Sequence, residues 1–319
     1  MSWLVTGGAG YIGAHVVRAL LAAGERAVVL DDLSSGVRGR LPEDVPLVVG
    51  STLESAAVRE ALRDVTGVIH MAARKAVGES VAEPLRYYRE NVGGLVSLLS
   101  GMAEAGVDRM IFSSSAAVYG TPQSSPVSED DRTEPQSPYG ETKLVGEWLV
   151  RDAAVATGLR FVNLRYFNVA GAASPDLGDV GVSNLVPLAF RAVVDGRSPE
   201  VFGVDYASPD GSCVRDYIHV ADLARAHVAA ARHVDTTPGC GATFNVGTGR
   251  GYSVLEVVRE VRRVTGVDVV PALVGRRPGD PAEVVADPTR IATELGWKAE
   301  HDLADMIDGA WSAWQHGRT

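Results

Sequence analysis

The sequence predicts an α/β fold, a doubly wound parallel sheet with a smaller C-terminal domain, and three observations support this prediction. Short β-branched apolar runs alternate with amphipathic segments of helical period through the first half of the 319 residues. A glycine-rich turn joins the first apolar run to the first helical segment. After about residue 166 the alternation weakens into loops rich in Gly, Pro and Asp, which indicates a second, smaller domain.

The first half contains six candidate strands. They are residues 3–6, 27–31, 47–49, 68–71, 110–113 and 161–164. Between the first two, apolar residues recur at helical spacing and a glycine stands where a helix would end: Ile12, Val16, Val17, Leu20, Leu21 and Gly24. These segments together predict a βαβ unit.

The second half is expected to contain loops at residues 172–181 and 206–212, with helices near residues 183–194 and 221–233. Residues 243–246 again have the apolar character of the first-half strands, so we expect the chain to return to the main sheet there. The predicted division is a first domain of residues 1–165 and a second formed mainly by residues 166–319.

The composition excludes several classes of protein. A net charge of −10 argues against nucleic acid as the main partner, because phosphate backbones are held by basic surfaces. With 46% hydrophobic residues and no apolar run near the ~18 residues of a membrane span, we expect a soluble enzyme. The N-terminus carries no export signal, which favours the cytoplasm. Cys213 and Cys240 are too few for a disulfide scaffold and lack the paired spacing and His partners of a zinc site, so we expect no metal.

The glycine-rich turn has the pattern of a dinucleotide site. Gly7, Gly10 and Gly13 allow a tight turn, close approach of the backbone to a pyrophosphate and close packing of the helix on the sheet. Asp31 ends the second strand about twenty residues further on, where it could accept hydrogen bonds from an adenosine ribose. A 2′-phosphate would face both Asp31 and Asp32. The sequence therefore predicts a Rossmann-type domain that binds NAD rather than NADP.

A candidate catalytic group follows the fifth strand. Tyr139 and Lys143 are four residues apart at the start of a predicted helix and so share one helical face. Free tyrosine has a pKa near 10, so the phenol becomes a useful base when a nearby cation, here Lys143 and the nicotinamide, stabilises the phenolate. Ser115 stands at the end of the fifth strand, where ligands bind in such sheets, and its hydroxyl could bond the reacting oxygen.

Six segments carry a family resemblance. They are VTGGAGYIG at residues 5–13, KAVGES at 75–80, FSSSAAVYG at 112–120, SPYGETK at 137–143, LRYFN at 164–168 and VRDYIHVADLA at 214–224. By these motifs the chain resembles the extended short-chain dehydrogenase/reductase family, and within it the UDP-glucose (UDP-galactose) 4-epimerase branch, over essentially its whole length. The resemblance implies that Tyr139 takes the proton of the C4 hydroxyl while NAD takes the C4 hydride, leaving a 4-keto sugar that turns and is reduced on its other face.

The resemblance also implies the two sets of binding residues. Beyond the residues already named for NAD, the cofactor set comprises Tyr11, Ile12, Leu33, Ser34, Ser35, Gly36, Ser51, Thr52, Met71, Ala72, Ala73, Lys75, Glu90, Ser113 and Phe167, together with Tyr139 and Lys143. The UDP-sugar set comprises Lys75, Ser115, Tyr139, Asn168, Asn184, Leu185, Val201, Phe202, Arg215, Tyr217, Arg277, Asp280 and Val284. A homodimer through the Tyr139 helix and the helix near residues 95–105 is expected on the same ground.

Several positions bear on which reaction, cofactor contacts and sugar we expect. Dehydratases of the family usually carry acidic residues where this chain has Ala116 and Ala117, which favours plain 4-epimerisation over a nucleotide-sugar dehydratase. Ser51 and Glu90 replace the residues expected beside the cofactor, so NAD contacts are expected to differ there. Val284 leaves room in the hexose pocket for UDP-N-acetylhexosamines. UDP-glucuronate or another sugar of a specialised pathway, and a non-catalytic NAD-sensing module, stay open as alternatives.

Overall fold

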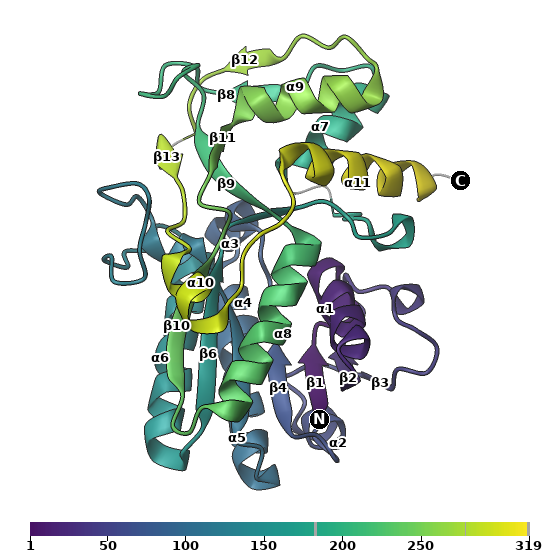
Figure 1. The fold of residues 1–319 in the computed structure, drawn as a ribbon, viewed down its shortest axis with the longest axis vertical. Helices are drawn as coiled ribbons and strands as arrows, with labels where there is room; N and C mark the ends of the chain where they lie inside the picture. The colour runs from purple at the N-terminus through teal and green to yellow at the C-terminus, as the bar shows by residue number, and fades with distance from the viewer. Residues whose placement is uncertain (182–183, 278, 318–319) are drawn as a thin grey trace.

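The computed structural model describes residues 1–181, 184–277 and 279–317, and a seven-stranded parallel sheet forms its centre (Figure 1). The strand order is β10-β6-β5-β4-β1-β2-β3. The strands are β1 (Ser2–Thr6), β2 (Arg26–Asp31), β3 (Leu47–Val49), β4 (Gly67–His70), β5 (Arg109–Ser115), β6 (Arg160–Tyr166) and β10 (Gly241–Val246). All six predicted first-half strands are confirmed within a few residues, as is the doubly wound parallel sheet.

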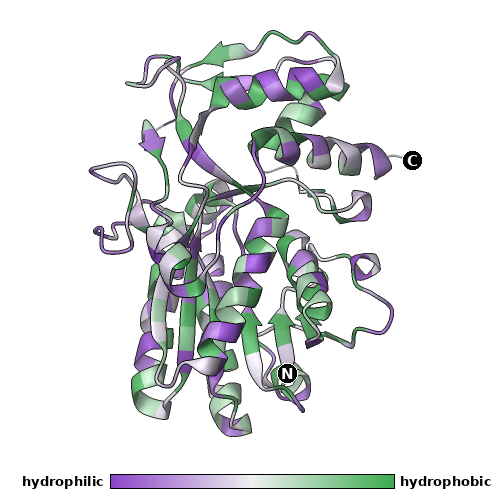
Figure 2. Cartoon of the chain, in the orientation of Figure 1, coloured by the Kyte–Doolittle hydropathy of each residue, from purple (hydrophilic) through white to green (hydrophobic). Residues whose placement is uncertain are grey.

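Helices cover both faces of this sheet, because successive residues of each strand point to opposite sides. Trp3 and Val5 of β1 belong to one apolar cluster, whereas Leu4 belongs to another. The first cluster is covered by α1 (Tyr11–Ala22), α8 (Val220–Thr236) and α10 (Thr289–Leu295); the second by α2 (Ser55–Ala61), α5 (Gly94–Ala105) and α6 (Pro138–Thr157). Burial on both faces explains why consecutive residues inside β1 and β2 are apolar, which Figure 2 shows as green segments in these strands.

A smaller layered unit lies at the carboxyl edge of the main sheet, at the top of Figure 1. Its sheets contain β7 (Asn168–Ala170), β9 (Val214–His219), β11 (Gly251–Ser253) and β13 (Glu283–Val284), and the separate pair β8 (Glu200–Phe202) and β12 (Ala272–Val274). Its helices are α7 (Leu185–Val194), α9 (Val254–Thr265) and α11 (Leu303–His316). In Figure 2 α9 alternates hydrophilic and hydrophobic residues, as expected for a helix with one buried face.

Shorter helical segments lie between these main elements. They are α3 (Val77–Ala82) and α4 (Pro84–Tyr87), the π-helical segment Tyr88–Gly93, and 3₁₀ turns at Arg38–Arg40, Ala116–Tyr119 and Pro175–Leu177. The last of these lies in the predicted loop 172–181. Among the described residues, no helix has the length and apolar character needed to cross a membrane.

The second half of the chain contributes to both layers. The predicted return to the main sheet is confirmed, since β10 pairs in parallel with β6. The helix predicted near residues 221–233 is α8, but it packs on the main sheet beside α1 rather than in the smaller unit, because Leu223, Ala226 and Ala230 form an apolar face. The other predicted helix is α7; Ser183, its expected first residue, lies outside the described residues. The domain division at residues 165 and 166, inside β6, stays a prediction.

Candidate active site

The glycine turn after β1 brings the start of α1 against the end of β4. Gly7 has a φ of +70°, and a Cβ there would lie 2.9 Å from the backbone nitrogen of Ala72. A Cβ on Gly13 would lie 2.1 Å from the carbonyl oxygen of Gly7, so only glycine permits this approach. Gly10 caps α1 without a side chain, which leaves the first-turn N–H groups facing the cleft. This is the arrangement that receives a pyrophosphate.

Asp31 stands across the turn from these N–H groups. Its carboxylate accepts 2.9 Å hydrogen bonds from the backbone nitrogens of Ala9 and Leu33, which fix its orientation. Burial raises the pKa of Asp31, and these two hydrogen bonds oppose the rise. A Cβ on Gly36 would lie 2.5 Å from Asp31 Oδ1, so this glycine is needed behind the carboxylate. The turn and the acid together fit the adenosine diphosphate part of NAD.

A cleft of about 650 Å³ runs from this turn to the catalytic helix. Eighteen of the residues predicted for the cofactor line it: Gly7, Gly10, Tyr11, Ile12, Gly13, Asp31, Asp32, Ser34, Ser35, Ser51, Thr52, Met71, Ala72, Ala73, Lys75, Glu90, Tyr139 and Lys143. Four do not. Leu33 and Gly36 shape the turn around Asp31, Ser113 is buried beneath the cleft, and Phe167 lines a second cavity.

The catalytic side chains come from α6 and the end of β5. Ser137 caps α6 by accepting a 3.2 Å hydrogen bond from the nitrogen of Gly140, and Pro138 follows at the first helical position. Tyr139 and Lys143 are both buried on the face of α6 that meets β5. Tyr139 shares a hydrogen bond with Ser115, and Lys143 Nζ donates a 2.8 Å hydrogen bond to the carbonyl oxygen of Ser113.

Burial dominates the electrostatics of this group. It raises the pKa of Tyr139, and the hydrogen bond with Ser115 partly offsets the rise. It also lowers the pKa of Lys143 to about 8, a shift that the negative charge of Glu147 opposes. Among the protein's own groups the pKa of Tyr139 is therefore raised rather than lowered, contrary to the expectation from the sequence, because loss of hydration outweighs the hydrogen bond with Ser115.

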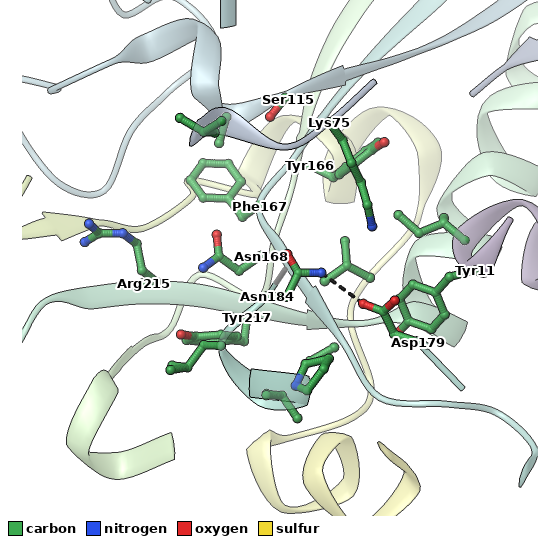
Figure 3. Close-up of a pocket in the computed structure, with 18 of the residues that line it drawn as sticks. Tyr11, Lys75, Ser115, Tyr166, Phe167, Asn168, Asp179, Asn184, Arg215 and Tyr217 are labelled. Carbon is green, nitrogen blue, oxygen red and sulfur yellow. Dashed lines mark hydrogen bonds between the residues drawn. The ribbon is translucent and has the colours of Figure 1, made fainter. Parts of the chain in front are cut away.

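A second cavity, of about 670 Å³, also has Tyr139 in its lining. Ten predicted substrate residues line it: Lys75, Ser115, Tyr139, Asn168, Asn184, Leu185, Arg215, Tyr217, Asp280 and Val284. Figure 3 shows Ser115 and Lys75 at one end, Arg215 at another and Asn168 between them. Seven residues line both this cavity and the cofactor cleft: Tyr11, Ile12, Lys75, Tyr139, Tyr166, Asp179 and Val180. Tyr139 therefore stands where the two spaces meet.

Three predicted substrate residues do not line either space. Val201 is fully buried in β8. The guanidinium carbon of Arg277 lies 3.7 Å from the centroid of the Phe202 ring, so these two side chains contact each other by a cation–π interaction. Arg215 keeps its place in the cavity, with Nη2 lying 3.6 Å from a carboxylate oxygen of Asp280.

Several lining residues were missed by sequence reasoning. Tyr166 lies within the LRYFN segment at the end of β6, which was the available signal, and Asp179 accepts a 3.0 Å hydrogen bond from Asn184. Asn91 accepts from the nitrogen of Arg74 (2.7 Å) and donates to its carbonyl oxygen (3.0 Å). No local pattern in the sequence marks these pairings.

Glu90, the unexpected acid beside the cleft, is not unpaired. Its carboxylate accepts a 2.6 Å hydrogen bond from Nε of Arg74 and a 3.1 Å hydrogen bond from Nε of Arg86. These hydrogen bonds and charges hold the pKa of Glu90 below its usual value despite partial burial. Arg89 Nη2 also lies 3.4 Å from Oε1, so the carboxylate contacts three cations.

Comparison with known proteins gives consistent matches along the chain. The model of the NAD dependent epimerase/dehydratase family matches residues 3–247. A UDP-glucose 4-epimerase from Azospirillum brasilense is 47% identical over 98% of this chain and 91% of its own. The structure of a UDP-glucose 4-epimerase from Stenotrophomonas maltophila, with bound NAD and formylated UDP-arabinopyranose, is 41% identical with a TM-score of 0.94, covering 100% and 99% of the two chains. That of a Brucella ovis UDP-glucose 4-epimerase in complex with NAD is 43% identical with a TM-score of 0.93, covering 99% and 98%.

Proposed function

The chain belongs to the NAD dependent epimerase/dehydratase family, and we propose that it is a UDP-sugar 4-epimerase that interconverts UDP-glucose and UDP-galactose through a 4-keto intermediate. One observation carries the proposal most directly: Tyr139 lines both the cofactor cleft and the second cavity, with Ser115 as its hydrogen-bond partner. In this position the Tyr139 hydroxyl can contact a sugar bound in the second cavity while a nicotinamide occupies the adjoining cofactor cleft.

The protein's own side chains transfer the proton of the sugar hydroxyl. Tyr139 Oη takes the proton of the C4 hydroxyl and later returns it, while the hydroxyl of Ser115 holds the same sugar oxygen. Lys143, fixed on the carbonyl of Ser113, adds a positive charge that favours the phenolate. When bound, NAD supplies the acceptor and then the donor of the C4 hydride, and is unchanged overall.

The second cavity supplies groups for the nucleotide diphosphate. Arg215 projects a guanidinium, which suits a phosphate because its planar fork can bond two oxygens. Asn168, Asn184 and Tyr217 add amide and phenol groups. Binding energy placed on the nucleotide leaves the hexose free to turn between oxidation and reduction, as inversion requires.

The nearest rival is a nucleotide-sugar dehydratase. Elimination of water needs an acid near the neighbouring carbons, whereas the cavity presents the methyl groups of Ala116 and Ala117 after Ser115. The test is incubation of the purified protein with UDP-glucose, UDP-N-acetylglucosamine and UDP-glucuronate, without added NAD, followed by product identification. We expect UDP-galactose from UDP-glucose; a 4-keto-6-deoxy sugar would overturn the argument from the two alanines.

We further propose a homodimer formed through α5 and α6. Val96 on α5 and Trp148 on α6 support it, since they are apolar side chains 46% and 47% exposed on two helices that contact each other. Light scattering at micromolar concentration, with Trp148→Glu as the disrupting variant, tests this state. The cytoplasmic location stays a prediction from the sequence.

A further inference from the structure

Three consecutive serines of β5 are each tied to a residue of α6, and the three α6 residues are one helical turn apart. Ser115 shares a hydrogen bond with Tyr139, and the carbonyl of Ser113 accepts from Lys143 at 2.8 Å. The hydroxyl of Ser114 donates a 2.5 Å hydrogen bond to Oε1 of Glu147. The reaction described so far uses the hydrogen bonds of Tyr139 and Lys143, but it assigns no role to the hydrogen bond between Ser114 and Glu147.

Glu147 is 6% exposed and is held from a third element. Arg165 of β6, the register partner of Ser114, donates from Nε to Oε1 (2.9 Å) and from Nη2 to Oε2 (2.7 Å). Arg165 also donates to Oη of Tyr119 at 3.0 Å. A buried ion pair of this kind is weak evidence for stability, because removing both charges from water offsets their attraction. Its position against the catalytic helix suggests another role.

Glu147 also acts on Lys143 through its charge: the two residues are four apart on α6, and the carboxylate raises the pKa of the lysine. His70 of β4 and Tyr166 of β6 also surround the lysine region, but burial lowers the pKa of His70 to about 3 and raises that of Tyr166. Tyr139, on the same helix, is likewise held neutral by burial. Arg165 neutralises part of the Glu147 charge from the far side. Within the described residues, Glu147 is the group that opposes loss of the Lys143 proton.

We propose that Glu147 is a positioning residue for the catalytic group: through Ser114 it fixes the register of α6 on β5, and its carboxylate keeps Lys143 charged at neutral pH. The proposal rests on the proposed 4-epimerase function, because it assigns Glu147 a part in preparing the base of that reaction.

Two variants separate the effect of the Ser114–Glu147 hydrogen bond from the effect of the Glu147 charge. Glu147→Gln keeps the shape and removes the charge, whereas Ser114→Ala removes the hydroxyl and leaves the charge in place. In Glu147→Gln we expect the alkaline limb of kcat to move down by about one pH unit, since Lys143 loses its proton earlier. In Ser114→Ala we expect kcat to fall with the limb unmoved and the KM for UDP-glucose changed less than about twofold. An unmoved limb in Glu147→Gln overturns the proposal.

A direct titration provides a readout independent of activity. The chain has only three lysines, Lys75, Lys143 and Lys298, so ε-labelled lysine NMR of the holoenzyme resolves Lys143 once Lys75→Arg and Lys298→Arg assign the others. We expect the Lys143 resonance to titrate at lower pH in Glu147→Gln than in wild type, and coincident curves overturn the proposal. If Glu147→Gln does not fold with Arg165 unpaired, Glu147→Gln with Arg165→Met is titrated in its place. A wild type without epimerase activity would refute the proposed function, whereas the titration would still decide the charge effect.

Discussion

Lys143 Nζ donates a 2.8 Å hydrogen bond to the carbonyl oxygen of Ser113 and lies 6.0 Å from the centroid of the Tyr139 ring. The lysine is therefore anchored to β5, and its effect on the phenol is exerted through space. At neutral pH its ammonium is retained, since burial lowers its pKa only to about 8. This geometry makes Tyr139 the proton-transfer group and Lys143 its electrostatic support, and it gives different expectations for substitutions at the two positions.

Tyr139→Phe is expected to lower kcat for UDP-glucose by about 10²- to 10⁴-fold, because the general base is removed while the ring and its packing remain. The measurement is the rate of UDP-galactose formation. NAD content and far-UV circular dichroism should match the wild type, which shows that the loss is chemical. Wild-type turnover in this variant would show that a group other than Tyr139 acts as the base.

Arg74 and Glu90 are expected to be coupled in NAD retention. Glu90→Gln removes the ion-pair partner of Arg74, whereas Arg74→Ala leaves Glu90 in contact with Arg86 and Arg89 alone. The backbone nitrogen of Arg74 is in turn bonded to Asn91. Arg74→Ala and Glu90→Gln should each raise the rate of NAD loss several-fold, and the double variant should lose NAD more slowly than the product of the two effects predicts.

NAD loss can be followed by gel filtration and absorbance of the released cofactor. Asp31→Ala serves as the matched control: it should loosen NAD without coupling to Arg74, since its carboxylate contacts Ala9 and Leu33 instead. Additive effects for Arg74 and Glu90 would mean that Glu90 acts on the cofactor independently of the ion pair.

Local patterns predicted the parts of the site that depend on neighbours in the sequence. The glycine turn, Asp31 at its strand end and the shared face of Tyr139 and Lys143 follow from spacing alone. Contacts between segments far apart in the chain could not be predicted from such local patterns. The contact of Arg277 with Phe202 and the hydrogen bond of Ser114 with Glu147 both depend on how one element packs on another. A local stretch of sequence does not encode that packing. The position of α8 on the main sheet was missed for the same reason.

Two buried histidines should make the fold acid-sensitive. Burial lowers the pKa of His70 to about 3 and that of His227 to about 4, from an ordinary value of 6.5. Below pH 6.5 the unfolded chain takes up these protons and the folded chain does not, so the free energy of unfolding falls as pH falls, by up to ~1.4 kcal/mol per pH unit for each histidine.

His227→Gln should therefore be less stable at pH 7, where it loses the 3.1 Å contact with Ser113, yet show a shallower pH dependence by about 1.4 kcal/mol per unit between pH 6 and 4.5. Urea unfolding at several pH values measures both quantities. Parallel curves for the two proteins would contradict a neutral, buried His227.

Val284 is expected to set the size of the sugar that the enzyme accepts. Its side chain is buried on β13, opposite Arg215 of β9, and lines the second cavity together with Ala116 and Phe167. A valine leaves space beside the hexose that a tyrosine would fill. We therefore expect the wild type to epimerise UDP-N-acetylglucosamine, and Val284→Tyr to lose at least about tenfold in kcat/KM for it while losing much less for UDP-glucose.

Val284→Ala is the matched control, because it alters the side chain without filling the space beside the hexose and should retain both substrates. Both activities are read from the same coupled assay, so the ratio of the two kcat/KM values isolates the size effect from any general loss of fold. A wild type that excludes UDP-N-acetylglucosamine as strongly as Val284→Tyr does would show that another wall of the cavity limits the sugar, and would move the determinant of specificity away from β13.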